Sequence, residues 1–141
     1  MNNFSYKSSK PFNKRLEEST LIMTKYPGRY PFIIERSSSS RSSIPHCPKS
    51  KFLVPGDITV GQMLAIVRRN MTLPPEIAIF LFCNNALPSS NTLMRELYHN
   101  NKENDGFAYI TYTGESTFGT PIIRDEPLHL VKLSNNFLSC T

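Results

Sequence analysis

The stretch KFLVPGDITVGQMLAIVRR, residues 51–69, contains a strand, a turn and a helix in succession. The apolar, partly β-branched run from Phe52 to Val54 is typical of a strand, and the cluster Pro55-Gly56-Asp57 ends it. Thr59 and Gln62 have the spacing of a capping box, which marks the start of a helix. Apolar residues then recur at helical spacing: Val60, Met63, Leu64, Val67 and Met71. The pattern predicts an amphipathic helix lying on a sheet.

The strand predicted at residues 51–54 begins with a basic side chain, Lys51. A strand at the edge of a sheet leaves a row of backbone amides and carbonyls unpaired. If this strand is an edge, another strand can pair with it, and the positive charge would attract acidic side chains. The stretch therefore suits the capture of an extended, acidic peptide.

A chain of 141 residues with a net charge of +5 is most simply one domain with a basic surface. The excess is greatest in residues 1–30, where Glu17 and Glu18 are outnumbered by basic residues: Lys7, Lys10, Lys14, Arg15, Lys25 and Arg29. This distribution favours anionic partners, and acidic peptides, anionic lipid headgroups and nucleic acid all satisfy it. A solvated basic face is the alternative.

The cysteines Cys47, Cys83 and Cys140 are odd in number and irregularly spaced, and the N-terminus has no secretory pattern, so we expect a reducing, cytosolic location. The histidines have no recognisable ligand spacing, so we expect no zinc, no other metal and no cofactor. The longest apolar run, residues 77–83, is far too short to cross a bilayer. Any membrane attachment is expected to be peripheral or covalent.

Two elements are expected before this stretch. Residues 11–26 should form a helix that starts at a proline and buries a stripe of apolar side chains: Phe12, Leu16, Ile22 and Met23. Residues 30–35 should form a strand, in which the early Pro31 suggests an edge or a first position. Residues 36–50, rich in serine, read as a long connecting loop.

The remaining elements follow the central helix. A strand buried on both faces is expected at residues 77–83, a turn at Asn84-Asn85, a short helix at 92–98 capped by Ser90 or Asn91, and a last strand at 107–112. This order predicts an α+β fold in which a mixed sheet clasps one helix. Residues 120–141 are expected to be a loosely ordered extension, with a short strand or helix at 128–133 as the alternative.

Four motifs at matching spacing resemble one known family: KYPGRYPFIIE at 25–35, KFLVPGDITVGQ at 51–62, FLFCNNALP at 80–88 and DGFAYITYTGESTFG at 105–119. They are similar to the GABARAP and microtubule-associated light-chain-three (autophagy-related protein 8) family of ubiquitin-like modifiers. The resemblance implies a ubiquitin-like β-grasp with two additional N-terminal helices. It divides the chain into a helical extension at 1–28 packed on the core, a β-grasp domain at 29–119 and an extension at 120–141 that is removed on processing.

The resemblance also implies a fate for the end of the chain. An autophagy cysteine peptidase would cut between Gly119 and Thr120, with Phe118 registering the segment in the peptidase. Activating and conjugating enzymes would then join Gly119 to phosphatidylethanolamine, moving the protein from the cytoplasm to the autophagosome membrane. Glycine suits this chemistry because it threads narrow channels in extended form. The chain itself would be a modifier and not an enzyme.

Receptors carrying an aromatic-x-x-aliphatic motif are the further partners that the resemblance implies. The positions matching the family's aromatic pocket are Glu18, Ile22, Pro31, Ile33, Lys51, Leu53 and Phe107. Those matching its aliphatic pocket are Phe52, Val54, Pro55, Ile58, Met63 and Ile66. Arg29 and Lys49, with Lys51, would meet acidic residues beside the motif. Without the resemblance most of these apolar residues would be assigned to the core, and for Ile33, Val54 and Ile66 that alternative stays open.

The chain departs from the family pattern in three places. Asn70 stands where many members have a basic residue at the end of the central helix, which weakens an expected contact with acidic ligands. The loop from Ser37 to Ser43 is longer and richer in serine than expected. The extension at 120–141 is long, which puts efficient trimming in question.

Three other readings compete with this one. Residues 105–112 match an RNA-recognition signature except at Asp105, which would repel phosphate, so no nucleic-acid partner is expected. His46-Cys47 offers no oriented nucleophile and base, and Cys83 lies in an apolar strand, so an enzyme is not expected. An unlipidated β-grasp adapter that binds peptides but keeps its tail is the third reading.

Overall fold

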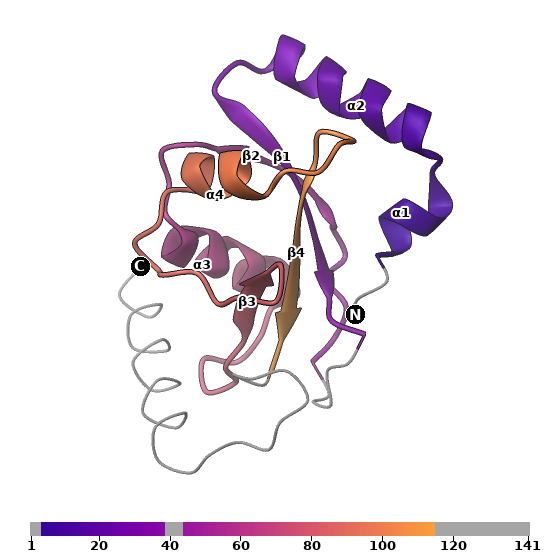
Figure 1. The fold of residues 1–141 in the computed structure, drawn as a ribbon. Coiled ribbons are helices and arrows are strands. Elements are labelled where there is room, and N and C mark those ends of the chain that lie inside the picture. Colours follow the sequence, from indigo (N-terminus) through magenta and orange to yellow (C-terminus); the bar gives the residue numbers. More distant parts are fainter. Residues whose placement is uncertain (1–3, 39–43, 115–141) are drawn as a thin grey trace.

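The computed structural model describes residues 4–38 and 44–114 of the chain. Its elements are, in order, α1 (Ser5–Ser9), α2 (Phe12–Lys25), β1 (Arg29–Arg36), β2 (Lys51–Pro55), α3 (Val60–Met71), β3 (Phe80–Cys83), α4 (Met94–Asn101) and β4 (Ala108–Thr113). The strands form one sheet in the order β2-β1-β4-β3. The helices α1 and α2 lie on one side of the sheet, and α3 and α4 lie on the other (Figure 1).

The sheet is mixed, as the sequence predicts. β1 pairs with β2 in an antiparallel sense and with β4 in a parallel sense, and β3 pairs antiparallel with β4. Arg29 is paired with Pro55 and Ile33 with Lys51 along the β1–β2 ladder. β1 and β4 therefore occupy the centre of the sheet, and β2 lies at one edge.

Local signals predicted α3 and its cap correctly. The backbone N–H of Gln62 donates to the Thr59 hydroxyl at 3.2 Å, and the Thr59 N–H donates to Gln62 Oε1 at 2.9 Å, so the capping box is present. The helix ends before Thr72, whose φ of 57° is left-handed. The inner face of α3 packs in the larger of the two core clusters, together with Phe32 of β1 and Ile110 of β4.

Of the apolar side chains that were predicted to be buried on α2, Ile22 is buried, but the prediction is wrong for the other three. Phe12, Leu16 and Met23 are 42, 39 and 38% exposed, and the residues of α2 that are buried are Ser19 and Ile22. The reason is a close approach of backbone to helix: the Ser19 hydroxyl donates to the carbonyl of Asp105 at 2.6 Å. A helix held this closely through a small residue turns its larger neighbours toward solvent.

The edge position suggested by Pro31 is also wrong, because β1 lies between β2 and β4. Pro31 is the third residue of β1 and stands opposite Leu53, in a pair whose backbone groups point away from each other. The ladder with β4 begins only at Phe32. No neighbouring strand therefore needs the N–H that proline lacks.

The first two elements after α3, β3 and α4, begin later than predicted. β3 covers only Phe80–Cys83, because the Arg68 guanidinium donates to the carbonyls of Pro74 and Ile77 and holds that segment as a loop. α4 begins at Met94 after Leu93, without the predicted side-chain cap from Ser90 or Asn91. Instead, the carbonyls of Ser90 and Thr92 accept the N–H groups of Gly61 and Val60 in the first turn of α3.

Two connections of the sheet are well defined. Asn84 and Asn85 have φ values of 52° and 63°, which confirms the predicted turn. The hydroxyl of Tyr112, whose side chain is buried, donates to the carbonyl of Pro45 at 2.9 Å and accepts from the N–H of Cys47 at 2.6 Å. These two bonds fix the end of the β1–β2 connection on β4.

Candidate peptide-binding site

β2 is an edge strand, which is the condition that peptide capture requires: among residues 4–38 and 44–114, only β1 pairs with it. The N–H of Ile34 donates to the Ser50 carbonyl at 2.8 Å, and the N–H of Gly56 donates to the Gly28 carbonyl at 3.2 Å. Hydrogen-bonded and non-hydrogen-bonded pairs alternate along an antiparallel ladder. Lys51 and Leu53 therefore direct their backbone N–H and C=O groups away from β1.

One outward acceptor has a partner from the side. The Arg29 guanidinium donates to the carbonyl of Leu53 at 3.2 Å. Pro55, the last residue of β2, has no N–H to offer. The outward donors of β2 are thus the N–H groups of Lys51 and Leu53, and a cation lies beside the outward carbonyl of Leu53.

The residues predicted for the aromatic pocket gather on the α2 side of the sheet. Ile22, Ile33 and Phe107 are buried in the smaller core cluster, with Leu53 packed against it. Pro31 is buried as well, opposite Leu53 in the ladder. The structure thus brings these apolar residues together as the floor of one site, in which Leu53 is the most accessible.

Glu18 and Lys51 form the rim of this site. The Glu18 carboxylate accepts from the Lys51 ammonium and from the Tyr6 hydroxyl, and it pairs with Lys10 at 3.0 Å. Burial, followed by the charge of Asp105, raises the pKa of Tyr6 to about 12, so its hydroxyl stays a donor. Burial and the nearby Lys10 lower the pKa of Lys51. With two ammonium groups on one carboxylate, the rim keeps a net positive charge.

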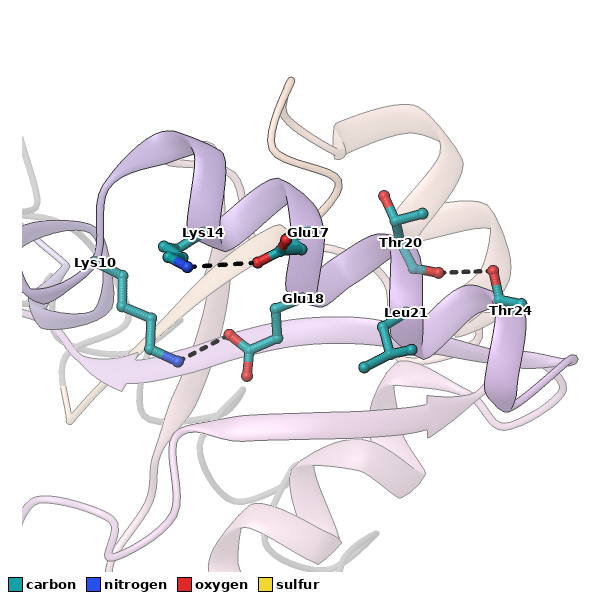
Figure 2. A pocket seen from close by; sticks show the side chains of 7 residues that line it. All are labelled: Lys10, Lys14, Glu17, Glu18, Thr20, Leu21 and Thr24. Carbon is teal, nitrogen blue, oxygen red and sulfur yellow. Dashed lines mark hydrogen bonds and ion pairs between the residues drawn. The ribbon is translucent and has the colours of Figure 1, made fainter.

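A groove of about 690 Å³ runs along α2 beside this rim. Figure 2 shows Glu18 and Leu21 pointing from the helix toward the strands below it. The groove is lined by Lys10, Lys14, Glu17, Glu18, Thr20, Leu21 and Thr24. Leu21 is 62% exposed, the highest value among the large apolar side chains described. An exposed leucine in a groove offers apolar surface to a ligand.

Sequence reasoning assigned no role in the site to Tyr6, Lys10, Lys14 and Leu21. Lys14, Glu18 and Leu21 are spaced i, i+4 and i+7, so helical spacing places them on one face of α2. That spacing was the signal for Lys14 and Leu21. Tyr6 and Lys10 precede the helix, and no local pattern brings them to Glu18.

All but one of the residues predicted for the aliphatic pocket lie on the α3 side of the sheet. Phe52, Val54 and Met63 are only 3, 1 and 1% exposed and belong to the larger core cluster. Ile58 and Ile66 are half-buried against this cluster, whereas Pro55, also half-buried, alternates onto the same face of β2 as Lys51 and Leu53. Of the residues whose core assignment stayed open, Ile33 and Val54 are buried and Ile66 is half-buried.

Basic side chains lie near both faces of β2. Arg29 reaches the outer edge, and the ammonium of Lys49 lies 4.9 Å from the centre of the Phe52 ring. Asn70 is exposed, and its amide donates back to the carbonyl of Ile66 at 2.9 Å. Asn70 therefore contributes no charge where a third basic residue was expected.

Two competing readings find no support in the geometry. Phe107 and Tyr109 are 0 and 4% exposed, so their rings cannot stack on RNA bases. Burial raises the pKa of Cys83 to about 11, which keeps its thiol protonated and unreactive.

Among the described residues there is no cluster of three side chains able to hold a metal ion. None of the helices described is long and apolar enough to cross a membrane.

Comparison with known proteins identifies the family. A family model described as "Autophagy protein Atg8 ubiquitin like" matches residues 14–119. The chain belongs to the Atg8 family. The Autophagy-related protein 8 of Candida glabrata is 48% identical over 115 residues, which are 82% of this chain and 96% of that protein. The Autophagy-related protein 8c of Arabidopsis thaliana is 47% identical over 119 residues, which are 84% and 98%.

A solved structure supports the same assignment. The crystal structure of Trypanosoma brucei ATG8 matches with a TM-score of 0.76 and 36% sequence identity, over 83% of this chain and 99% of that one. The Atg8 membership and the mixed sheet confirm the predicted α+β, ubiquitin-like β-grasp with two additional N-terminal helices. Phe118, Gly119 and the extension at 120–141 lie outside the described residues, as does most of the Ser37–Ser43 loop.

Proposed function

We propose that this ubiquitin-like autophagy modifier captures extended, acidic peptides with an aromatic-x-x-aliphatic motif on the open edge of β2. The observation that carries the proposal is the position of that edge. The outward backbone groups of Lys51 and Leu53 lie between an apolar site on the α2 side and another on the α3 side. A peptide paired with β2 has access to both sites.

The spacing of the motif agrees with this arrangement. In an extended peptide, residues i and i+3 point to opposite faces, so they need pockets on opposite sides of the added strand. Glu18 and Lys51 border the α2 site at the start of β2, and Ile58, which follows the end of β2, borders the α3 site. In an aromatic-x-x-aliphatic motif the aromatic residue is N-terminal. A peptide that places this residue near the start of β2 and its aliphatic residue near the end therefore runs parallel to β2.

Charge adds selectivity to the site. The ammonium groups of Lys10 and Lys51 share one carboxylate, and Arg29 and Lys49 lie close by. Acidic residues beside the motif would be attracted to this positive surface. The attraction speeds the association of acidic peptides with the site, and the same charge repels basic peptides. Receptors with acidic flanks are the partners that fit.

Membrane attachment is the second part of the proposal. An autophagy cysteine peptidase cuts between Gly119 and Thr120, and the Phe118 side chain positions this segment in the peptidase. Activating and conjugating enzymes then carry Gly119 as a thioester. The amine of phosphatidylethanolamine then attacks the thioester carbonyl, an amide forms and the enzyme thiol leaves. The chain supplies the acyl group without catalysing the transfer. It moves from the cytoplasm to the autophagosome membrane.

Intact masses of the protein from its own cells, taken separately on membrane and soluble fractions, test this second part. We expect a chain ending at Gly119, with the added mass of phosphatidylethanolamine in the membrane fraction. A full-length, unmodified chain in both fractions would refute processing and support the unlipidated adapter. Peptide titration by calorimetry tests the first part, because either form retains β2.

Reversing the charge of Lys51 should weaken capture of an acidic peptide. Lys51→Glu places a second carboxylate beside Glu18 and removes the ammonium that faces the peptide. We expect Kd to rise about tenfold, equivalent to about 1.4 kcal/mol, and to depend less on salt. Lys102→Glu is the control, since it changes the net charge equally and lines no part of the groove. An equal loss in both variants would mean that only overall charge matters.

A further inference from the structure

A buried carboxylate joins α2 to the sheet beneath the peptide groove. Asp105 is 1% exposed. Its Oδ2 accepts from the Arg15 Nε at 2.8 Å and from the Tyr109 hydroxyl, and its Oδ1 accepts from the N–H of Phe107 at 3.0 Å. The Asp105 carbonyl accepts from the Ser19 hydroxyl at 2.6 Å. We call Arg15, Ser19, Asp105 and Tyr109 the Asp105 cluster.

The Asp105 cluster fixes how closely α2 approaches the sheet. Gly106 has a φ of 85°, and a Cβ atom built there would overlap the side chain of Ser19. The helix is therefore in contact with backbone at this point and cannot move closer. The ion pair and the Ser19 hydrogen bond prevent it from moving away. The separation between helix and sheet is thus determined from both directions.

The same separation determines the shape of the aromatic site. Glu18 follows Arg15 by three residues and Ile22 follows Ser19 by three, so each lies on the helix face that the cluster anchors. Phe107, on the floor of the site, is two residues from Asp105, and its backbone N–H donates to the Asp105 carboxylate. The helix wall and the floor of the site are thus attached to one residue, Asp105, through its carboxylate and its backbone carbonyl.

Two further contacts extend the cluster to α1. The Arg15 Nη1 donates to the carbonyls of Lys10 at 2.7 Å and Lys7 at 3.3 Å, which fixes the connection between α1 and α2. Lys10 in turn pairs with Glu18 on the rim. The hydrogen bond that Arg15 donates to Asp105 raises the pKa of Arg15, so the guanidinium keeps its charge. Burial, with Asp105 beside it, raises the pKa of Tyr109 above its usual range, so the hydroxyl remains a donor.

We propose that the Asp105 cluster positions α2 and thereby sets the width of the aromatic site on the α2 side of the sheet. The cluster then governs how strongly the aromatic residue of a captured peptide is held. This inference rests on the proposed peptide capture. Arg15, Asp105 and Tyr109 act through Glu18, Ile22 and Phe107 and do not touch the peptide. The apolar site on the α3 side of the sheet is independent of the cluster.

The test uses the full chain and three acidic peptides. The first has Trp and Leu at the two motif positions, the second replaces Trp by Ala, and the third replaces Leu by Ala. Tyr109→Phe removes one hydroxyl from the cluster and keeps the ring. Arg15→Gln removes the cation. Tyr112→Phe is the matched control, because it removes a hydroxyl from the same strand in the other core cluster.

Calorimetry gives the ratio of Kd values for each peptide pair. We expect the penalty for Trp→Ala to shrink about threefold or more in Tyr109→Phe, and further in Arg15→Gln, while the penalty for Leu→Ala stays at its wild-type value. Tyr112→Phe should change neither penalty. A uniform loss across all three peptides, or no change in Tyr109→Phe, would overturn the inference. If Arg15→Gln does not fold, Tyr109→Phe decides alone.

The outcome separates this inference from the proposed function. Wild-type protein that binds the Trp-Leu peptide, with both penalties unchanged in the variants, leaves peptide capture standing and removes the role of the cluster. Wild-type protein that binds none of the three peptides overturns peptide capture and this inference together.

Discussion

Replacing Asp105 by alanine should lower the free energy of unfolding by about 3–5 kcal/mol. Asp105 is 1% exposed and pairs with Arg15, whose side chain is 14% exposed. Removing the carboxylate leaves the guanidinium in a largely buried position without its counter-charge, and it also removes the acceptor of the Tyr109 hydroxyl. Both groups would have to find water or stay unpaired, which accounts for the size of the loss.

Urea unfolding followed by circular dichroism measures this change. The control is Asp57→Ala, the same substitution at an exposed carboxylate, which should change the free energy of unfolding by less than about 0.5 kcal/mol. A loss below about 1 kcal/mol in Asp105→Ala would show that Arg15 is readily resolvated. In that event α2 would be held mainly by the apolar contacts of Ile22, which is buried in the smaller core cluster.

The elements that could be predicted from sequence are those whose determinants are local. α3 is one, because the capping box of Thr59 and Gln62 spans only three residues and the helix pattern follows it directly. The Asn84-Asn85 turn is another, since both residues tolerate positive φ. In both cases the interacting groups are adjacent in the chain.

The burial of α2 could not be predicted in this way. Periodicity favoured Phe12, Leu16 and Met23, but the helix is held by polar groups whose partners are distant in sequence. Arg15 and Asp105 are 90 residues apart, and Ser19 and Asp105 are 86 residues apart. An apolar stripe reports which residues prefer burial, whereas the tertiary contacts decide which side of the helix is buried.

Competition for backbone groups explains the error at α4. Ser90 and Asn91 are good capping residues, but the Ser90 and Thr92 carbonyls accept from N–H groups at the start of α3. That pairing keeps residues 90–93 outside the helix, so α4 starts at Met94. The capping residues and the start of α3 can each be recognised in the sequence. The hydrogen bonds between these two segments cannot.

The candidate site, too, was predictable from sequence where its determinants are local and not where they depend on distant contacts. A short stretch of sequence predicted the charge beside β2 and what an edge position there would permit, but not the edge position itself. The residues assigned to the two apolar sites came from the family resemblance and stay a prediction. The rim depends on Tyr6 and Lys10 reaching Glu18, which only the packing of α1 against the sheet provides. The chemistry of the site was therefore predictable further than its geometry.

Proline at position 53 should abolish most peptide capture while leaving the fold intact. The N–H of Leu53 points away from β1, so the β1–β2 ladder does not use it, and proline is tolerated at such positions of an edge strand. A peptide added to β2 would lose that donor, and its own carbonyl would be left unpaired against the ring. We expect a loss of about 2–3 kcal/mol, equivalent to a Kd about 30–150 times higher.

Two controls decide whether the missing donor is the cause. Leu53→Val keeps the N–H and an apolar side chain, so its Kd should stay within about threefold of wild type. Val54→Pro removes an N–H that faces Tyr30 across a hydrogen-bonded pair, so it should destabilise the fold itself by about 3 kcal/mol or more. Calorimetry and urea unfolding on the same preparations separate binding from stability. If Leu53→Pro binds as tightly as Leu53→Val, the peptide is held by side chains alone and does not extend the sheet.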